Sequence, residues 1–330
     1  MSDKVTIATV AERAGVSRQT VSNVLNAPHI VREETRRRVQ DAIAALGYRT
    51  NQAARQMRTG RSRLIATRIE PTRDGINGSV LDRFLHGLTE TGEAAGYRTM
   101  LYTATDAERE IAVYDDLLGS YDLDGFVLTG TDHGDPRTTW LAERGVPFVT
   151  FGRPWDDLDA HCWVDVDGAA GTAQATSHLL ASGHRQIGWI GWPAGSGVGD
   201  DRRAGWHDTL HAAGVDPAGL ARETVDGIGE GERWARDLLA MATPPTALVC
   251  ASDSLALGAL QAVREADSPV PVIGFDDTPV AAAIGLTSVS QPLGDAAARC
   301  VDLLTAVLDG PHRTPAPVLL QPTLVRRCTA

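Results

Sequence analysis

The side chains with the most specific chemistry lie on a short stretch near the N-terminus, residues 18–26, which reads RQTVSNVLN. In the major groove of DNA, arginine pairs with guanine through two hydrogen bonds, and glutamine or asparagine pairs with adenine. If this stretch is a helix lying in that groove, the side chains predicted to reach base edges are Arg18, Gln19, Ser22 and Asn23. Hydroxyl and amide groups beside them suit phosphate contacts, which position a protein on DNA without reading its sequence. These candidates are Ser17, Thr20 and Asn26.

The residues before and within this stretch predict a helix-turn-helix. Thr6 can cap a first helix over residues 7–14, and Ser17 can cap the second. Gly15 lies between them and suits the left-handed backbone that a tight corner needs. Ala11, four residues before this glycine, is small enough to let the two helices approach. The alternative is an ordinary corner between two helices of a larger helical domain.

A third helix follows, because residues that can form one buried face recur at steps of three and four. They are Thr35, Val39, Ala42, Ile43 and Leu46. Gly47 is placed to end this helix, and three short helices can close a small core.

Charge is distributed unevenly along the chain. Residues 1–63 hold 12 Lys and Arg against 5 Asp and Glu, whereas the remaining residues hold 19 and 37, for a total net charge of −11. A basic head joined to an acidic body indicates a polyanion-binding module attached to a different one. The alternative is a solvated helical surface, because basic segments are common.

Composition and motifs exclude several classes of protein. With 43% hydrophobic and 22% charged residues, the 330-residue chain is neither disordered nor fibrous. No apolar run approaches the roughly 18 residues of a membrane span, and the N-terminus shows no secretory signal, so we expect a cytoplasmic protein without a membrane partner. The four scattered cysteines and the histidines predict no metal site, and the absence of GK[ST], HExxH and GxSxG predicts no cofactor and no enzyme.

The pattern changes from residue 64 onward, where short apolar runs alternate with helical stretches. This alternation predicts parallel sheets with helices on both faces, and the length predicts two lobes. Ligands of open α/β sheets bind beyond the carboxyl ends of strands, so the cleft between the lobes is the expected site. The predicted strands are residues 64–69, 97–102, 125–129, 146–151, 186–191, 246–250 and 270–275.

The N-terminal motifs VTIATVAERAGVSRQTVSNVLN, LGYRTN and NQAARQMRTGRS closely resemble the head of the lactose-repressor (LacI/GalR) family of transcriptional regulators. The resemblance implies that residues 51–59 form a hinge helix that orders on DNA, whereas the sequence alone also allows a flexible tether. In the family a leucine wedges into the minor groove, and Met57 occupies its position here. Further DNA contacts implied by the resemblance are Thr6, Tyr48, Asn51, Ala54 and Arg58.

The body resembles the same family, whose effector module is similar to periplasmic sugar-binding proteins. The motifs are VDVDGAAGTAQATSHLLASGHRQIGWIG, DDRRAGW, ASDSLALGAL and PVIGFDD. The resemblance implies a helix-turn-helix domain at 1–50, a hinge at 51–63 and an effector-binding and dimerisation domain at 64–330. It also implies three crossings between lobes, the first lobe being about 64–162 and 293–321 and the second about 163–292 and 322–330.

Two residues of the body are implied ligands. The family places an acid and an arginine where this chain has Asp276 and Arg202, and both groups suit sugar hydroxyls. The alternatives are a turn cap for Asp276 and a surface ion pair with Asp200 or Asp201 for Arg202. Further candidates at strand ends or with a ring face are Phe84, Thr129, Arg153, Ser196, Trp206, Ser252, Asp253 and Gln291. Phe84 and Trp206 are equally suited to a core, and Gly152 and Ile228 stand where some members have an acid and an aromatic residue.

Together these features predict a homodimeric repressor that binds a pseudo-palindromic double-stranded operator and responds to a small effector. The expected effector is a mono- or oligosaccharide that controls sugar-utilisation genes. The alternatives are a regulator with a purine or other metabolite as corepressor, a sugar-acting enzyme with a DNA-binding head, and a sugar receptor.

Overall fold

Three short helices form the N-terminal part of the protein. The computed structural model describes residues 5–48, 60–70, 76–310 and 315–330, and the chain divides into two units, Met1–Ser62 and Arg63–Ala330. The helices of the first unit are α1 (Ile7–Ala14), α2 (Arg18–Asn26) and α3 (Glu33–Leu46), with the 3-10 turn η1 (Pro28–Ile30) before α3. The predicted bounds of the first two helices are confirmed.

Caps and a glycine corner hold the first two helices in place. The Thr6 hydroxyl accepts a hydrogen bond from the backbone N–H of Thr9, and the Ser17 hydroxyl accepts one from that of Thr20 at 3.0 Å. Gly15 adopts φ 63°, the left-handed conformation that glycine reaches without a steric cost. The helices then close a small core, whose buried residues are Val10, Ala11, Ala14, Val21, Val24, Val39 and Ala42.

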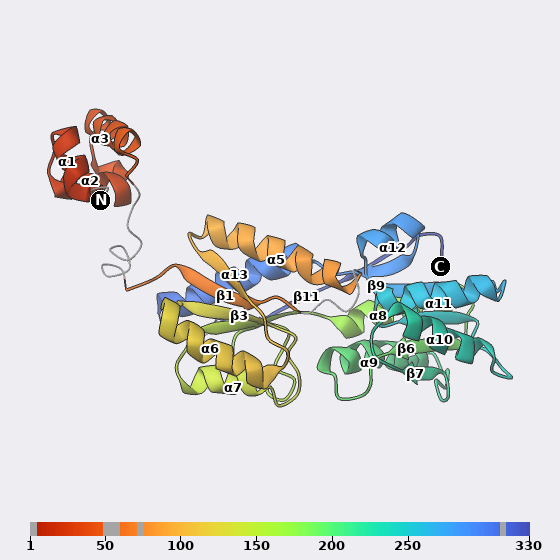
Figure 1. Cartoon of the computed structure of the whole chain (residues 1–330). Coiled ribbons are helices and arrows are strands. Elements are labelled where there is room, and N and C mark those ends of the chain that lie inside the picture. Colours follow the sequence, from red (N-terminus) through yellow and green to blue (C-terminus); the bar gives the residue numbers. More distant parts are fainter. Residues whose placement is uncertain (1–4, 49–59, 71–75, 311–314) are drawn as a thin grey trace. The chain divides into compact units, whose positions relative to one another are not determined.

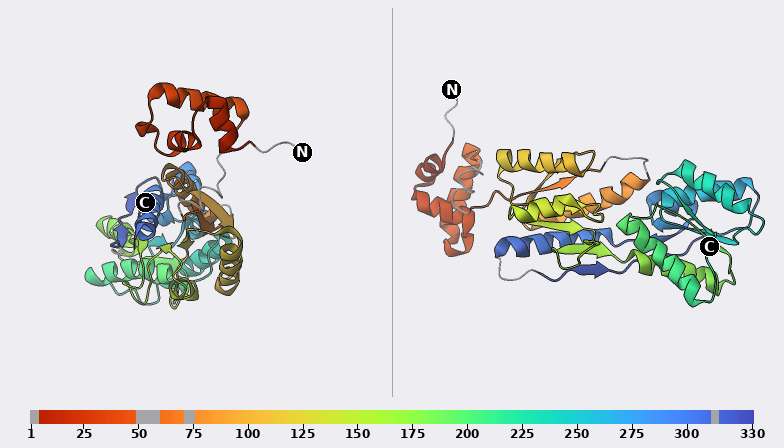
Figure 2. Two further views of the ribbon diagram at one scale, coloured as in Figure 1. Left: turned by 90° about the vertical axis from the view of Figure 1, so that its left-hand side faces the viewer. Right: turned by 90° about the horizontal axis from the view of Figure 1, so that it is seen from below.

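The body contains two six-stranded sheets, each forming a lobe with its helices (Figures 1 and 2). The first sheet is parallel throughout, in the order β11-β5-β4-β3-β1-β2. Its strands are β1 (Leu64–Arg68), β2 (Arg98–Tyr102), β3 (Gly125–Thr129), β4 (Phe148–Phe151), β5 (Trp163–Val166) and β11 (Val318–Leu320). The helices of this lobe are α5 (Asn77–Ala94), α6 (Ala107–Tyr121), α7 (Pro136–Glu143) and α13 (Leu293–Asp309).

Alternating side chains of the first sheet pack against helices on both of its faces. Ile65 belongs to a core cluster with residues of α5 and α13, whereas the next residue, Ala66, belongs to a cluster with residues of α6 and α7. Figure 1 shows the same arrangement, with α5 and α13 on one side of the strands and α6 and α7 on the other. This layering confirms the predicted α/β body.

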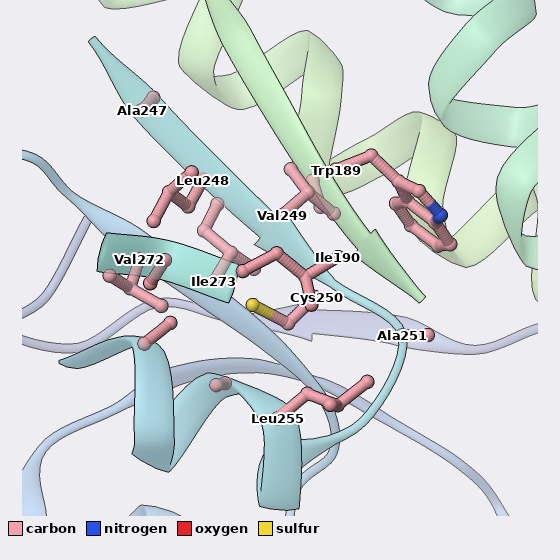
Figure 3. Close-up of a cluster of buried hydrophobic side chains, with 14 of the residues drawn as sticks. Trp189, Ile190, Ala247, Leu248, Val249, Cys250, Ala251, Leu255, Val272 and Ile273 are labelled. Atoms are coloured by element: carbon pink, nitrogen blue, oxygen red, sulfur yellow. The ribbon is translucent and has the colours of Figure 1, made fainter. Parts of the chain in front are cut away.

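The second sheet has the order β12-β10-β9-β8-β6-β7, and only β12 is antiparallel to its neighbour. Its strands are β6 (Ile187–Gly191), β7 (Ala221–Glu223), β8 (Ala247–Cys250), β9 (Val272–Asp276), β10 (Thr287–Ser290) and β12 (Thr323–Val325). Its helices are α8 (Gly168–Ala181), α9 (Gly197–Ala212), α10 (Ile228–Leu239), α11 (Asp253–Glu265) and α12 (Pro279–Ile284). Figure 3 shows how Trp189, Ile190, Leu248, Val249 and Ile273 fill the interior around the central strands, where all five are buried.

The chain passes between the two lobes after Val166, between Ser290 and Leu293, and between Leu320 and Thr323. The boundary implied at residue 162 needs a correction, because β5 lies inside the first sheet, hydrogen-bonded to β4 and β11. The crossing therefore follows β5 instead of preceding it. The strand prediction missed β5, β7, β10, β11 and β12, each of which has only three or four residues.

Helices α10 and α11 approach each other through two glycines. A Cβ atom added to Gly231 would lie 2.1 Å from the carbonyl oxygen of Leu255, and one added to Gly258 would lie 1.9 Å from that of Ile228. Both contacts are with backbone atoms, so a methyl group fits at neither position unless the helices move apart. Among the described residues, none of the helices has the length and apolar character to cross a membrane.

We predict that Gly258→Ala lowers the free energy of unfolding by at least about 1–3 kcal/mol, because the added methyl group overpacks a backbone contact. Urea denaturation followed by circular dichroism measures this change. Gly229→Ala is the matched control, because Gly229 is in α10 and an added Cβ atom there has nothing within 4 Å. Alanine is the better helix former, so this variant is expected to raise the free energy of unfolding by up to about 1 kcal/mol. Equal stability of the two variants would contradict the glycine contact.

Candidate functional site

The exposed face of α2 carries the side chains predicted to read bases. Arg18 and Gln19 are exposed, while Val21 and Val24 on the same helix are buried in the head core. Ser22 and Asn23 are half-buried. The Gln19 amide donates to the Asn23 side-chain oxygen at 3.0 Å, so these two amides are held together one helical turn apart. The four candidates therefore lie on a rigid, capped helix whose other face is fixed by packing.

Hydroxyl and amide groups border this face. The Ser17 and Thr20 hydroxyls lie 2.8 Å apart, and the Asn26 amide donates to the Ser22 carbonyl oxygen at 2.7 Å. Thr6 is exposed at the start of α1, and Tyr48 packs half-buried against the head core. The remaining predicted DNA contacts, Asn51, Ala54, Met57 and Arg58, lie outside the described residues.

A cavity of about 190 Å³ lies between the two lobes of the body. It is lined from the first lobe by Thr129, Phe151 and Asp165, which are in the C-terminal parts of β3, β4 and β5. From the second lobe it is lined by Trp192 after β6, Asp276 at the end of β9, and Arg202 in α9. The site therefore lies beyond the carboxyl ends of the strands of both sheets, as expected for open α/β sheets.

Arg202 and Asp276 face each other in this cavity, and both are 6% exposed. The Arg202 Nη1 atom lies 3.4 Å from Asp276 Oδ1 and donates to the Ala251 carbonyl oxygen at 2.6 Å. The guanidinium also stacks over the ring of Phe275, 3.7 Å from its centroid. The Gln291 amide donates to Asp276 Oδ1 at 2.7 Å. Neither alternative prediction describes this pair, because Arg202 is buried and faces Asp276 instead of Asp200 or Asp201.

Burial raises the pKa of Asp276, and the positive charge of Arg202 opposes this rise. The backbone of Asp276 has φ 113°, a conformation that residues other than glycine rarely adopt. The turn that follows is capped by Thr278, whose hydroxyl accepts from the backbone N–H of Ala281 at 3.2 Å. The Asp276 carboxylate is therefore held in the cavity rather than used as a cap.

A second charged group joins the two lobes at the cavity. Arg153 of the first lobe donates from Nε to Asp165 at 2.6 Å and from Nη2 to Asp201 of α9, in the second lobe, at 3.2 Å. Burial raises the pKa of Asp165 and of Asp201, and Arg153 opposes both shifts. Beside this group, the Trp155 ring packs on Gly197 at the start of α9, where an added Cβ atom would lie 2.3 Å from the indole.

Four of the ten predicted ligand residues line the cavity: Thr129, Arg202, Asp276 and Gln291. Arg153 does not line the cavity itself, but it forms ion pairs with Asp165 and Asp201, which do. Phe84 is a core residue, fully buried and stacked on Phe151 with a centroid separation of 4.5 Å. Trp206 is also in a core, because its ring stacks on Trp189 and its N–H donates to the Ile187 carbonyl oxygen.

The other predicted ligand residues fix the ends of helices. Ser196 caps α9, and Ser252 caps α11. Asp253 is fully buried and accepts hydrogen bonds from the backbone and hydroxyl of Thr278 and from the hydroxyl of Ser288, at 2.6–2.8 Å. These contacts occupy both carboxylate oxygens, so the residue tightens the loop after β9 and does not line the cavity.

Sequence reasoning missed several residues that line the cavity. They are Phe151, Trp155, Asp165, Trp192, Asp201 and Phe275. Trp192 follows a predicted strand directly, so the strand-end rule could have found it. Asp165 lies in a strand that was not predicted, and Asp201 was considered only as a partner of Arg202. Among residues 5–48, 60–70, 76–310 and 315–330, no group of three His, Cys, Asp or Glu side chains is placed to hold a metal ion.

Comparisons with known proteins agree with both parts of this arrangement. Residues 6–51 match the model of bacterial regulatory proteins of the lacI family, and residues 176–330 match that of a periplasmic binding protein-like domain. The chain is 32% identical to the HTH-type transcriptional regulator CelR of Thermobifida fusca, over 98% of this chain and 97% of the relative.

Two solved structures are similar over nearly the whole chain. A complex of the transcriptional regulator CelR with cellobiose has a TM-score of 0.74 and 29% identity, covering 99% of this chain and 100% of that one. The lac repressor dimer bound to operator and the anti-inducer ONPF has a TM-score of 0.83 and 27% identity, covering 99% of each chain. These relatives are transcriptional regulators and not enzymes. The chain therefore belongs to the LacI family of DNA-binding transcriptional regulators.

Proposed function

We propose that this regulator is a homodimeric repressor whose affinity for a pseudo-palindromic operator is set by a sugar bound between its lobes. The observation that carries the proposal is the buried Arg202–Asp276–Gln291 group at the strand ends of the cavity. A carboxylate accepts hydrogen bonds from neighbouring hydroxyls, and guanidinium and amide groups donate to hydroxyl oxygens. The aromatic walls, from Phe151, Trp155 and Trp192, suit the apolar face of a sugar ring.

The head supports the DNA-binding half of the proposal. Arg18, Gln19 and Asn23 offer the side-chain types that pair with guanine and adenine, and each good pair distinguishes the correct base by about 1–3 kcal/mol. The basic charge of residues 1–63 supplies attraction to phosphates that does not depend on sequence. A dimer places two such helices on two half-sites, which explains why the expected operator is a pseudo-palindrome.

The cavity supports the regulatory half, because both lobes contribute to its walls. A ligand changes a conformational equilibrium only by binding one state better than the other. A molecule that contacts Thr129 of the first lobe and Asp276 of the second senses the angle between them. Such coupling is typically about 1–3 kcal/mol, which is roughly a 5- to 150-fold change in operator affinity. We infer that the sugar acts as an inducer.

Arg18→Ala is expected to weaken binding to the preferred operator by about 1–3 kcal/mol and to relax the choice of base at one position of each half-site. Selection of DNA ligands from a random library, done in parallel with the wild type and the variant, measures both effects. Arg32→Ala serves as a control, since Arg32 is exposed in the same basic head but lies outside α2. An unchanged selected consensus for Arg18→Ala would show that this side chain does not read DNA.

Asp276→Asn is expected to weaken sugar binding by about 10- to 100-fold, because a hydrogen bond to a charged group contributes about 1.5–3 kcal/mol. Asparagine also tolerates positive φ, so the backbone at this position is preserved. Calorimetric titration with the sugar that most raises the melting temperature of the wild type measures the loss. Operator affinity of the ligand-free variant should stay at the wild-type value. Full sugar affinity in the variant would remove Asp276 from the site.

Sugar affinity is expected to fall as the pH is lowered through neutrality. Burial raises the pKa of Asp276, so its carboxylate becomes protonated at a higher pH than an exposed aspartate. The neutral acid has lost its negative charge, and one of its oxygens has become a donor, so it accepts hydrogen bonds from sugar hydroxyls less strongly. The raised pKa also means that the folded state binds this proton more tightly than the unfolded state, so the same protonation favours folding. Titrations between pH 6 and pH 8 test this, with Asp276→Asn as the reference that keeps Asp165 and Asp201 but lacks the titration of Asp276. A flat wild-type profile would contradict it.

A further inference from the structure

We propose that the effector is a single uncharged sugar ring, that disaccharides are excluded by the closed end of the cavity, and that phosphorylated sugars are excluded by the carboxylates in its walls. This inference rests on the proposed function and specifies the ligand of the same site. It follows from the size of the cavity, from the contacts that close it across the two lobes, and from the charges already present in its walls.

The volume of the cavity sets the first limit. Its 190 Å³ is close to the roughly 150 Å³ of an engineered cavity that binds one benzene ring. It is below the roughly 300–1,000 Å³ of pockets that hold drug-sized ligands. A six-membered ring with its hydroxyl groups matches this space, whereas two linked rings do not.

Contacts between the lobes close the cavity beside Trp155. The indole packs on Gly197 of α9 and donates its N–H to the Thr131 carbonyl oxygen at 3.0 Å, so it is fixed from both sides. The guanidinium of Arg153 stacks on the same ring, 4.8 Å from its centroid, and bonds Asp201 across the lobes. A second sugar ring would have to displace Trp155 and break the ion pair between Arg153 and Asp201.

The charges in the walls oppose an anionic ligand. Three carboxylates line the cavity, those of Asp165, Asp201 and Asp276. Each of the two arginines at the site already faces one or two of them: Arg153 bonds Asp165 and Asp201, and Arg202 bonds Asp276. A phosphate needs cationic donors that are not already matched by carboxylates. An uncharged ligand avoids this cost.

Two buried donors indicate where such a ring hydrogen-bonds. Within the described part of the chain, Trp192 Nε1 and Arg202 Nε have no hydrogen-bond partner, and both residues line the cavity. A buried donor without an acceptor costs about 1–3 kcal/mol. Hydroxyl oxygens of a ring seated against these residues supply the missing acceptors without introducing charge.

Calorimetric titration of the full-length protein tests the inference with matched probes. These are glucose, galactose and xylose as single rings, glucose 6-phosphate and galactose 6-phosphate as anions, and cellobiose and lactose as disaccharides. We expect at least one single ring to bind at least tenfold more tightly than its phosphate and than the disaccharide that contains it. Tighter binding of a disaccharide or a phosphate overturns this inference and leaves the proposed function intact. If no sugar binds while operator DNA does, the sugar response itself is refuted, and the inference with it.

Two variants assign the exclusion to named residues. Trp155→Ala is expected to change the ratio of disaccharide affinity to single-ring affinity at least tenfold in favour of the disaccharide. Trp140→Ala is the control, because Trp140 packs against the core cluster that contains residues of α6 and α7. Asp201→Asn is expected to reduce the difference in affinity between the sugar and its phosphate. Asp200→Asn, at the neighbouring position of α9, is expected to leave this difference in affinity unchanged. If the affinity ratios change equally in each variant and its control, Trp155 and Asp201 are not the residues that exclude disaccharides and phosphates.

Discussion

The burial of Arg202 and Asp276 in one cavity is the interaction on which the body depends. Neither charge could be buried alone, because an unpaired charge in the protein interior costs several kcal/mol. The pair is loose at 3.4 Å, and Arg202 relies also on the Ala251 carbonyl oxygen and the ring of Phe275. A pair held in this way keeps some hydrogen-bonding capacity, since Arg202 Nε has no partner among the described residues. The cavity is therefore a polar interior with a donor left unpaired, and in our proposal the hydroxyl groups of a sugar supply its acceptor.

The second charged group, formed by Arg153, Asp165 and Asp201, connects the two lobes at the cavity. Arg153 joins two carboxylates, one from each lobe, and Trp155 rests on a glycine of the opposite lobe. Any change in the angle between the lobes alters these contacts, whereas the interior of each lobe, built on strands buried on both faces, stays rigid. In our proposal, ligand binding therefore acts on the contacts at the boundary between the lobes. In the head, by contrast, a small capped core leaves one face of α2 available for DNA.

Local sequence signals predicted the parts of the fold that depend on neighbouring residues. The caps Thr6 and Ser17 and the corner at Gly15 placed the first two helices correctly, and the longer apolar runs placed the central strands. The strands that escaped prediction lie at an edge of their sheet or next to one, and their three or four residues carry no clear period. The site depended on contacts between distant segments. Phe84 and Trp206 have aromatic rings that could stack on a sugar, and yet both lie in cores. Trp155 and Asp201 line the cavity only because one lobe packs on the other.

The central claim is that one equilibrium links the cavity to DNA, and thermodynamic linkage tests it directly. The measurement is a closed cycle: operator affinity by fluorescence anisotropy with and without saturating sugar, and sugar affinity by calorimetry with and without saturating operator. Our account predicts that sugar lowers operator affinity by roughly 5- to 150-fold and that operator lowers sugar affinity by the same factor. If the protein binds both sugar and operator, but neither one changes the affinity for the other, the account is contradicted.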